Sequence, residues 1–154
     1  TRMLKTHKTE FIWDIKHIRG GLVDVEFITQ FLQLHYGHKH PDIMIRDTKS
    51  VLEILKNKAL LNATIADDLL QALELWSSLQ GMLRLTIPRE TRQLRQHGIP
   101  VSLREKLACV GGTVDYTALL KKMDTCSNKV VKHYNTIISK PAAYLKKTET
   151  PSKN

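Results

Sequence analysis

The clearest periodic pattern lies towards the C-terminus, where apolar side chains recur every three or four residues between positions 115 and 139. This period places the apolar residues on one face of an α-helix. Asp115 stands at the start as a candidate N-cap, and Pro141 lies just beyond the end. The pattern predicts a helix over 115–139 whose inward face consists of Tyr116, Leu119, Leu120, Met123, Cys126, Val130, Tyr134, Ile137 and Ile138.

A second long pattern predicts a helix over 64–86, which Ile87-Pro88 should end because proline cannot continue a helix. Thr64 followed three residues later by Asp67 resembles a capping box, so we expect Thr64 to cap this helix. The expected inward residues are Leu69, Leu70, Leu73, Trp76, Leu79, Met82 and Leu83, and the expected outward residues are Gln71, Glu74 and Ser78.

Two shorter helices are predicted from their caps. Asp47 should begin a helix that runs to about Asn57, and Ser102 should begin one that closes at Gly111-Gly112. The residues between 89 and 101 are polar and arginine-rich, which is typical of a mobile connection. The inward side chains of the first short helix are expected to be Val51, Leu52 and Leu55.

The segment 22–36 also has a helical period, but apolar residues cover most of its circumference. A narrow polar stripe remains, with steps of four, three and four residues. We therefore expect this helix to be central and buried, after the end of a helix at 2–9, an extended stretch at 11–16 and a turn at 17–21. The stripe consists of Glu26, Gln30, Gln33 and Gly37.

Composition agrees with one helical domain. The 154 residues are 42% hydrophobic and 25% charged, which suffices for a single core. No stretch approaches the roughly 18 uncharged apolar residues of a membrane span, so we expect no membrane partner. We predict an all-α fold, an irregular bundle of about five helices with a short extended N-terminal segment. The domain should occupy 1–139, and the basic tail 140–154 should be disordered.

Cysteine usage and charge limit the setting of the chain. Cys109 and Cys126 lack metal-type spacing, so a reduced, cytoplasmic chain is the simpler interpretation. The formal charge of +9 is compatible with a stand-alone helical module that binds nucleic acid. Acidic residues are interspersed with the basic ones, however, and aromatic residues do not alternate with them as in single-strand platforms. Nucleic acid is the weaker alternative.

Asp24 and Glu26 are two carboxylates in an otherwise apolar segment. Residues two apart on a helix diverge by about 200°, so the pair should not hold one metal ion together, and we expect no metal site. Asp24 lies in the first turn, where a carboxylate can accept hydrogen bonds from free amides near Gly21. Glu26 heads the polar stripe of a nearly buried helix, where an unpaired carboxylate would be costly, so we expect it to have a basic partner such as Arg84, Arg19 or Lys16.

The double glycine Gly20-Gly21 has two interpretations. The first is a tight turn with positive backbone torsions that leads the chain into the helix. The second is an anion site, in which free amides at the helix start and the neighbouring Arg19 receive a phosphate. A double glycine alone does not decide between them.

The stretch IKHIRGGLVDVEFITQFLQLHYGHKHP at 15–41, with its Gly-Gly-x-x-Asp-x-Glu-Phe core, closely resembles the start of a helical domain in bacterial glutamine synthetase adenylyltransferase. That domain follows the nucleotidyltransferase domain of the family. The likeness continues through 47–61 and 72–85, and it loosely covers 102–139. The GHKHP continuation and the lysine-rich tail resemble the C-terminal, adenylylating half of these enzymes. A related PII uridylyltransferase shares this type of helical domain and is the nearest alternative.

The resemblance implies a part of a longer enzyme that uses ATP and magnesium to adenylylate or deadenylylate a tyrosine of glutamine synthetase. The catalytic carboxylates of the family belong to a domain that would precede Thr1, so we expect this chain alone to be inactive and to hold no cofactor. Its partners would be its own nucleotidyltransferase domain and glutamine synthetase, with the PII signal protein as a candidate third partner. No catalytic residue is assigned; the candidates for the domain interface, or for contact with a phosphate there, are Lys16, Arg19, Gly20, Gly21, Asp24 and Glu26.

Overall fold

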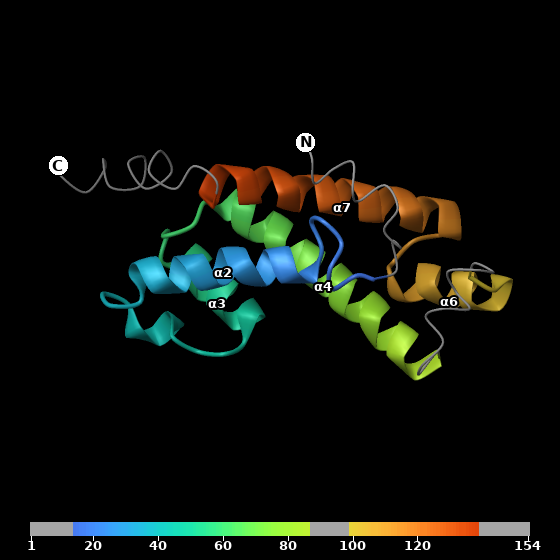
Figure 1. Ribbon diagram of the computed structural model, residues 1–154, viewed down its shortest axis with the longest axis horizontal. Helices are drawn as coiled ribbons and strands as arrows, with labels where there is room; N and C mark the ends of the chain where they lie inside the picture. Colours follow the sequence, from blue (N-terminus) through green and yellow to red (C-terminus); the bar gives the residue numbers. More distant parts are fainter. Residues whose placement is uncertain (1–13, 87–98, 139–154) are drawn as a thin grey trace.

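The computed structural model describes residues 14–86 and 99–138 (Figure 1). These residues form a bundle of helices and, within both ranges, no strand, so the predicted all-α class is confirmed. The predictions for 2–9, 11–13, 89–98 and 140–154 lie outside the described residues. The elements are α2 (Leu22–Tyr36), a single 3-10 turn η1 (Pro41–Ile43), α3 (Thr48–Asn57), α4 (Ala63–Thr86), α6 (Val101–Val110) and α7 (Tyr116–Ile137).

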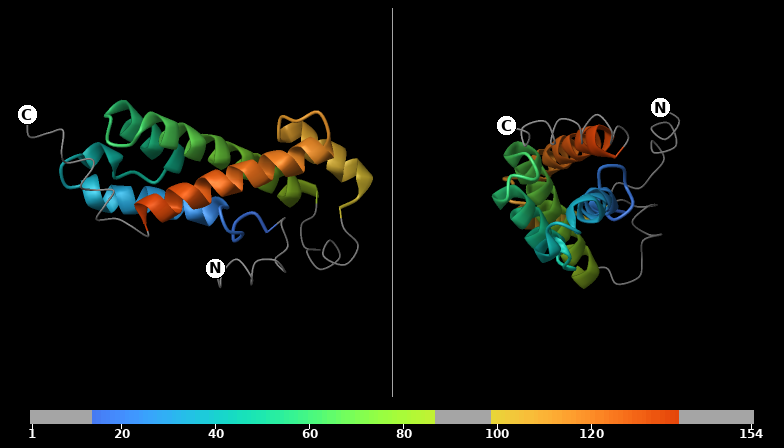
Figure 2. Two further views of the ribbon diagram at one scale, coloured as in Figure 1. Left: turned by 90° about the horizontal axis from the view of Figure 1, so that it is seen from above. Right: turned by 90° about the vertical axis from the view of Figure 1, so that its left-hand side faces the viewer.

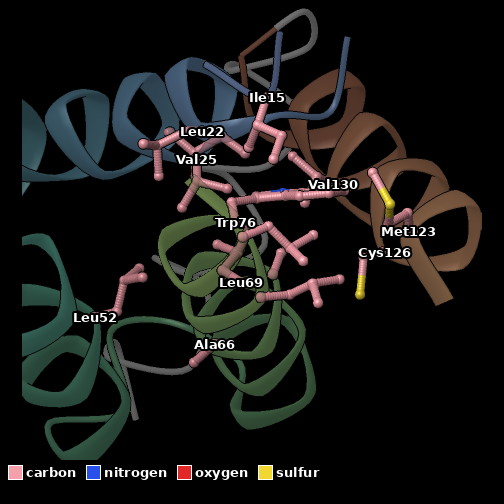
Figure 3. Packing of buried hydrophobic residues seen from close by; sticks show 14 of the residues in the cluster. Ile15, Leu22, Val25, Leu52, Ala66, Leu69, Trp76, Met123, Cys126 and Val130 are labelled. Atoms are coloured by element: carbon pink, nitrogen blue, oxygen red, sulfur yellow. The ribbon is translucent and has the colours of Figure 1, made fainter. Parts of the chain in front are cut away.

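Helix α4 is the centre of the bundle. It contacts α2, α3, α6 and α7, and Figure 2 shows these helices arranged around it. The fully buried Trp76 of α4 extends towards Val25 of α2 and Val130 of α7 (Figure 3). The 24-residue length of α4 explains this role, because a helix this long can support several shorter helices along its sides.

Two predicted N-caps are confirmed. Asp47 accepts a hydrogen bond from the backbone amide of Ser50 at 3.2 Å, which begins α3. Asp115 accepts one from the amide of Ala118 at 2.7 Å, which begins α7. In both cases a short carboxylate just before the helix satisfies an amide that has no partner inside the helix.

Two other predicted caps are wrong. The amide of Thr64 donates to the side-chain oxygen of Asn62 at 2.8 Å, so Asn62 caps α4 and Thr64 is the capped residue. Helix α6 begins at Val101 after Pro100, which places Ser102 inside the first turn. An N-cap residue lies just outside the helix, whereas the apolar period begins inside it. The period therefore does not show that α4 and α6 begin directly after Asn62 and Pro100.

Helix α2 is buried on one side only. Leu22, Val25, Ile28 and Leu32 are buried in the core, but Leu34 on the opposite face is 79% exposed. The prediction of a central, buried helix is therefore wrong, because α4 occupies the centre and leaves α2 on the surface.

The chain before α2 is a turn where the sequence predicted an extended segment. The carbonyl of Asp14 accepts hydrogen bonds from the amides of His17 and Ile18, both at 3.0 Å. Ile15 is only 2% exposed and packs into the core from this turn. An apolar side chain can be buried in this way without a neighbouring strand, so the pattern of 11–16 did not require extension at 14–16.

Candidate functional site

The loop 14–21 provides its own partners for the start of α2. The amides of residues 21–23 donate, in that order, to the carbonyl oxygens of Ile18, Ile15 and Lys16 at 2.9, 3.0 and 3.1 Å. The first amides of a helix normally lack partners within the helix. Here the preceding turn folds back and satisfies them.

Asp24 completes this arrangement. Its carboxylate accepts a hydrogen bond from the amide of Gly20 at 2.6 Å, which confirms that it binds an amide next to Gly21. The amides of residues 20–23 therefore all donate within the loop and the first turn. None of these four amides is left for an anion, and the structure favours the tight-turn interpretation of the double glycine over a phosphate site.

Both glycines are required by close packing. Gly20 has φ of +76°, and a Cβ there would lie 2.8 Å from the Cα of Ser127, in the backbone of α7. A Cβ on Gly21 would lie 2.8 Å from the carbonyl oxygen of Ile18. The loop is thus pressed against α7 at one glycine and against itself at the other, which leaves no room for a side chain at either position.

The structure separates the predicted basic residues from Glu26. Lys16 is exposed, and Arg19 is half-buried with an Nε atom that is buried and makes no hydrogen bond among the described residues. Arg84 is exposed and lies about two turns of α4 beyond Ser77, which is the last α4 residue to line the same cleft as Glu26. Within the described part of the chain, no ion pair joins Glu26 to any of these three bases.

Glu26 instead lines a cleft of about 690 Å³ between α2, α3 and α4. The sequence did not indicate this cleft, because it depends on how three helices pack. Glu74 also lines the cleft, from α4. The sequence predicted that Glu74 faces outwards but not that it lines a cleft. The charged residues that line it are Glu26, Arg46, Asp47, Lys49, Glu53, Asp67 and Glu74, and the apolar ones are Leu22, Leu70 and Leu73.

Two of the cleft carboxylates already have structural roles. Asp67 forms an ion pair with Lys56 at 2.7 Å. Hydrogen bonds from the hydroxyl and the amide of Ser50 lower the pKa of Asp47 below its ordinary value. Across residues 14–86 and 99–138, Glu26, Glu53 and Glu74 form no ion pair, so these three carboxylates can accept hydrogen bonds or meet a cationic group.

A second polar cluster joins α4 to α7. His133 is only 8% exposed, and its Nε2 lies 2.8 Å from the carboxylate of Asp68, which is also 3.7 Å from the Nζ of Lys129. The sequence patterns described above did not single out His133. Two turns before His133 on α7, desolvation by burial raises the pKa of the Cys126 thiol, which keeps it protonated and unreactive. This cluster therefore connects two helices and is not suited to nucleophilic catalysis.

In the two described ranges, no three His, Cys, Asp or Glu side chains are grouped to hold a metal ion. The carboxylate of Asp24 binds the loop at the amide of Gly20, whereas Glu26 lines the cleft. Both cysteines are free. None of the described helices combines the length and the hydrophobicity needed to cross a membrane.

Comparison with known proteins identifies the family. A family model described as GlnD PII-uridylyltransferase matches residues 1–138. The chain belongs to this family. No solved structure matches it.

Curated relatives carry the name that the Gly-Gly-x-x-Asp-x-Glu-Phe motif suggested. Bifunctional glutamine synthetase adenylyltransferase/adenylyl-removing enzyme from Nitrosomonas eutropha is 33% identical over 82% of this chain and 13% of its own length. The protein of the same name from Xanthobacter autotrophicus is 32% identical over 85% of this chain and 13% of its own length. One from Rhodopseudomonas palustris is 40% identical over 49% of this chain and 8% of its own length. The chain thus spans only a small part of these relatives.

Proposed function

We propose that this chain is the helical domain of a glutamine synthetase adenylyltransferase, and that it supports a catalytic domain located elsewhere in a longer polypeptide. One observation carries the proposal: relatives of that name align with 82–85% of this chain but with only 13% of their own length. The reaction is the transfer of an adenylyl group from ATP to a tyrosine of glutamine synthetase, or its removal, in the cytoplasm.

The contents of the chain agree with a supporting role. ATP and Mg²⁺ belong to the parent enzyme in this proposal. Within the 14–21 loop, Gly20, Gly21 and Asp24 are occupied by contacts that hold the loop against α7 and α2. Lys16 is exposed, and Arg19 is half-buried at the same loop. We assign these two bases to the contact with the catalytic domain.

The decisive experiment compares the 154-residue chain with a longer polypeptide that also carries the nucleotidyltransferase domain. Each is incubated with glutamine synthetase, Mg²⁺ and ATP labelled at the α-phosphate. Label should reach glutamine synthetase only with the longer polypeptide. Transfer by the 154-residue chain alone would contradict the supporting role, and no transfer by either would contradict the assignment to glutamine synthetase.

The loop assignment has its own test. Lys16→Gln in the longer polypeptide should slow adenylyl transfer, because an exposed lysine contributes to the interface and not to the fold of this chain. The matched control is Lys106→Gln, which changes an exposed lysine on α6, away from the loop and the cleft. Both variants should leave the urea midpoint of the 154-residue chain unchanged. Equal transfer by the two variants would remove Lys16 from the interface.

A second function is favoured by the description of the matching family model, which refers to PII-uridylyltransferase. In that case the parent would transfer a uridylyl group from UTP to the PII signal protein. The same assay distinguishes the two when UTP and PII replace ATP and glutamine synthetase. Label transferred from UTP to PII, with none transferred from ATP, would establish the alternative.

A further inference from the structure

Helix α2 carries an apolar row on the side that faces away from the bundle. Phe27 is 54% exposed and Leu34 is 79% exposed, and Val23 lies half-buried one turn before Phe27. The row continues past the end of the helix, where the Sδ of Met44, itself 55% exposed, would lie 2.5 Å from a Cβ placed on Gly37. We call Val23, Phe27, Leu34 and Met44 the outer ridge.

The outer ridge is continuous along the helix axis. Successive helical residues rotate by about 100°, so Phe27 and Leu34 point within about 20° of one another and roughly opposite to the buried Val25 and Leu32. Val23, Phe27, Gln30 and Leu34 follow steps of four, three and four, which is the spacing of a helix seam that packs against another helix. Helix α2 contacts α3, α4 and α7 (Figure 2), and the exposure of Phe27 and Leu34 shows that no described helix covers this part of the outer ridge.

Such a row differs from ordinary exposed apolar residues. Single exposed leucines are common on soluble proteins, whereas contiguous apolar surface usually marks an interaction site. Val114, at 95% exposure in the turn between α6 and α7, is an example of the first kind. The outer ridge is of the second kind, because three of its members lie along α2, where only the uncharged Gln30 interrupts them, and Met44 continues the row next to Gly37 at the end of the helix.

We propose that the outer ridge of α2 is covered by an apolar helix of the nucleotidyltransferase domain of the same polypeptide. This inference rests on the proposed function, because the relatives contain several times more chain than the 13% that this sequence spans. A covalently linked domain is present at high effective concentration, so a small apolar contact suffices to hold it.

A second copy of this chain is a poorer occupant. Stable complexes between separate proteins use about 20–30 residues on each side. The outer ridge consists of four residues, and no further large apolar residue of α2 is exposed beyond Phe27 and Leu34. Contacts between domains of one chain can be smaller and still persist, because their association is not opposed by dilution.

The test is the chemical accessibility of a cysteine placed on the ridge. Cys109 is exposed and would react, so it is first replaced by serine, while Cys126 is buried. Leu34→Cys is then introduced into the 154-residue chain and into the longer polypeptide that carries the nucleotidyltransferase domain. Val114→Cys in the same two backgrounds is the matched control, because it also replaces an exposed apolar residue.

We expect Leu34→Cys to react with a maleimide at a similar rate to Val114→Cys in the 154-residue chain. In the longer polypeptide, Leu34→Cys should react more slowly by about tenfold or more, while Val114→Cys is unaffected. Equal rates for Leu34→Cys in both polypeptides would overturn the proposal, as would equal protection of both positions. Protection in the 154-residue chain that grows with its concentration would identify a second copy as the occupant and would also overturn it.

The labelling result is independent of the enzymatic assay. Protection of Leu34→Cys without adenylyl transfer would leave the interface standing and contradict the proposed function. Adenylyl transfer without protection of Leu34→Cys would support the proposed function and contradict the interface. Leu34→Ser provides a second readout: because Leu34 is 79% exposed, the change should leave the melting temperature of the 154-residue chain nearly unchanged and lower that of the longer polypeptide.

Discussion

Replacement of Gly20 by alanine should be strongly destabilising, for two separable reasons. Gly20 has φ of +76°, and this conformation costs an L-residue about 1–2 kcal/mol relative to glycine. A Cβ would also lie 2.8 Å from the Cα of Ser127, in a helix backbone that cannot rotate away as a side chain could. Overpacking of this kind costs about 1–3 kcal/mol.

Alanine also reduces the conformational entropy of the unfolded chain, which offsets about 0.4–1 kcal/mol of this destabilisation. Gly20→Ala should therefore lower the free energy of unfolding by about 2–4 kcal/mol, a large fraction of the total for a domain of this size. Gly112→Ala is the matched control. Gly112 has a similar φ of +71°, but its Cβ would meet only the flexible Lys122 Nζ at 3.5 Å, so this variant should lose about 1 kcal/mol.

The free energy of unfolding of both variants is measured by urea titration, with the helical circular dichroism signal as the probe, because most described residues are helical. The slope against urea concentration should be the same for each, so that the midpoint reports stability. The difference between Gly20→Ala and Gly112→Ala isolates the contact of the loop with α7. Equal losses for the two variants would refute the reasoning, since they would show that Gly20 is needed only for its backbone torsion.

Two further predictions concern polar contacts. His133→Leu should lower the free energy of unfolding by about 1–3 kcal/mol, because Asp68 loses the hydrogen bond of a buried partner; a double-mutant cycle with Asp68→Asn that shows no coupling would contradict this. The pKa of Asp47 is lowered by Ser50, so its stabilising effect is present above the ordinary value of 3.8 and is lost as pH falls through the lowered folded value. Asp47→Asn should therefore flatten the acid side of a urea-midpoint profile recorded from pH 6 to pH 2, and an unchanged profile would exclude Asp47 as a source of acid sensitivity.

The elements that sequence predicted well are those set by local patterns. Helix α7 has one apolar stripe and one acidic cap, so its inward face has a single solution, and its observed start at Tyr116 agrees with Asp115 as the cap. His133 could have been found by the same reasoning. It lies three residues after Val130 and four before Ile137, which is the phase of the buried stripe, and a polar residue in that phase predicts a buried partner.

Helix α2 shows why periodicity alone can fail. Leu22, Val25 and Leu32 on one side are no more apolar than Phe27 and Leu34 on the other, so the pattern gives no unique inward face. The interpretation as a buried helix treated both sides as core. The choice between them depends on which helices lie nearby, and that is a property of the packed bundle.

In the candidate site, too, roles set by local chemistry were predictable and roles set by helix packing were not. Asp24 binds the amide of Gly20, four residues away, so its role follows from local helix chemistry. Glu26 lines a cleft whose other walls come from α3 and α4, and the bases predicted as its partners do not pair with it among the described residues. Contacts between segments 20 or more residues apart depend on the packing of helices, which composition and spacing do not determine.

The double glycine connects the fold to the proposed interface. Because α2 is apolar on two sides, its sequence would tolerate rotation about its own axis. The loop prevents this, since Gly20 is fixed against the backbone at Ser127 and is tied to the first turn of α2 through Asp24. The position of Asp24 around the helix is thereby set relative to α7. With that position set, Val25 and Leu32 are buried in the core, and Phe27 and Leu34 face outwards. The glycines thus select which apolar face builds the bundle and which is left for a partner.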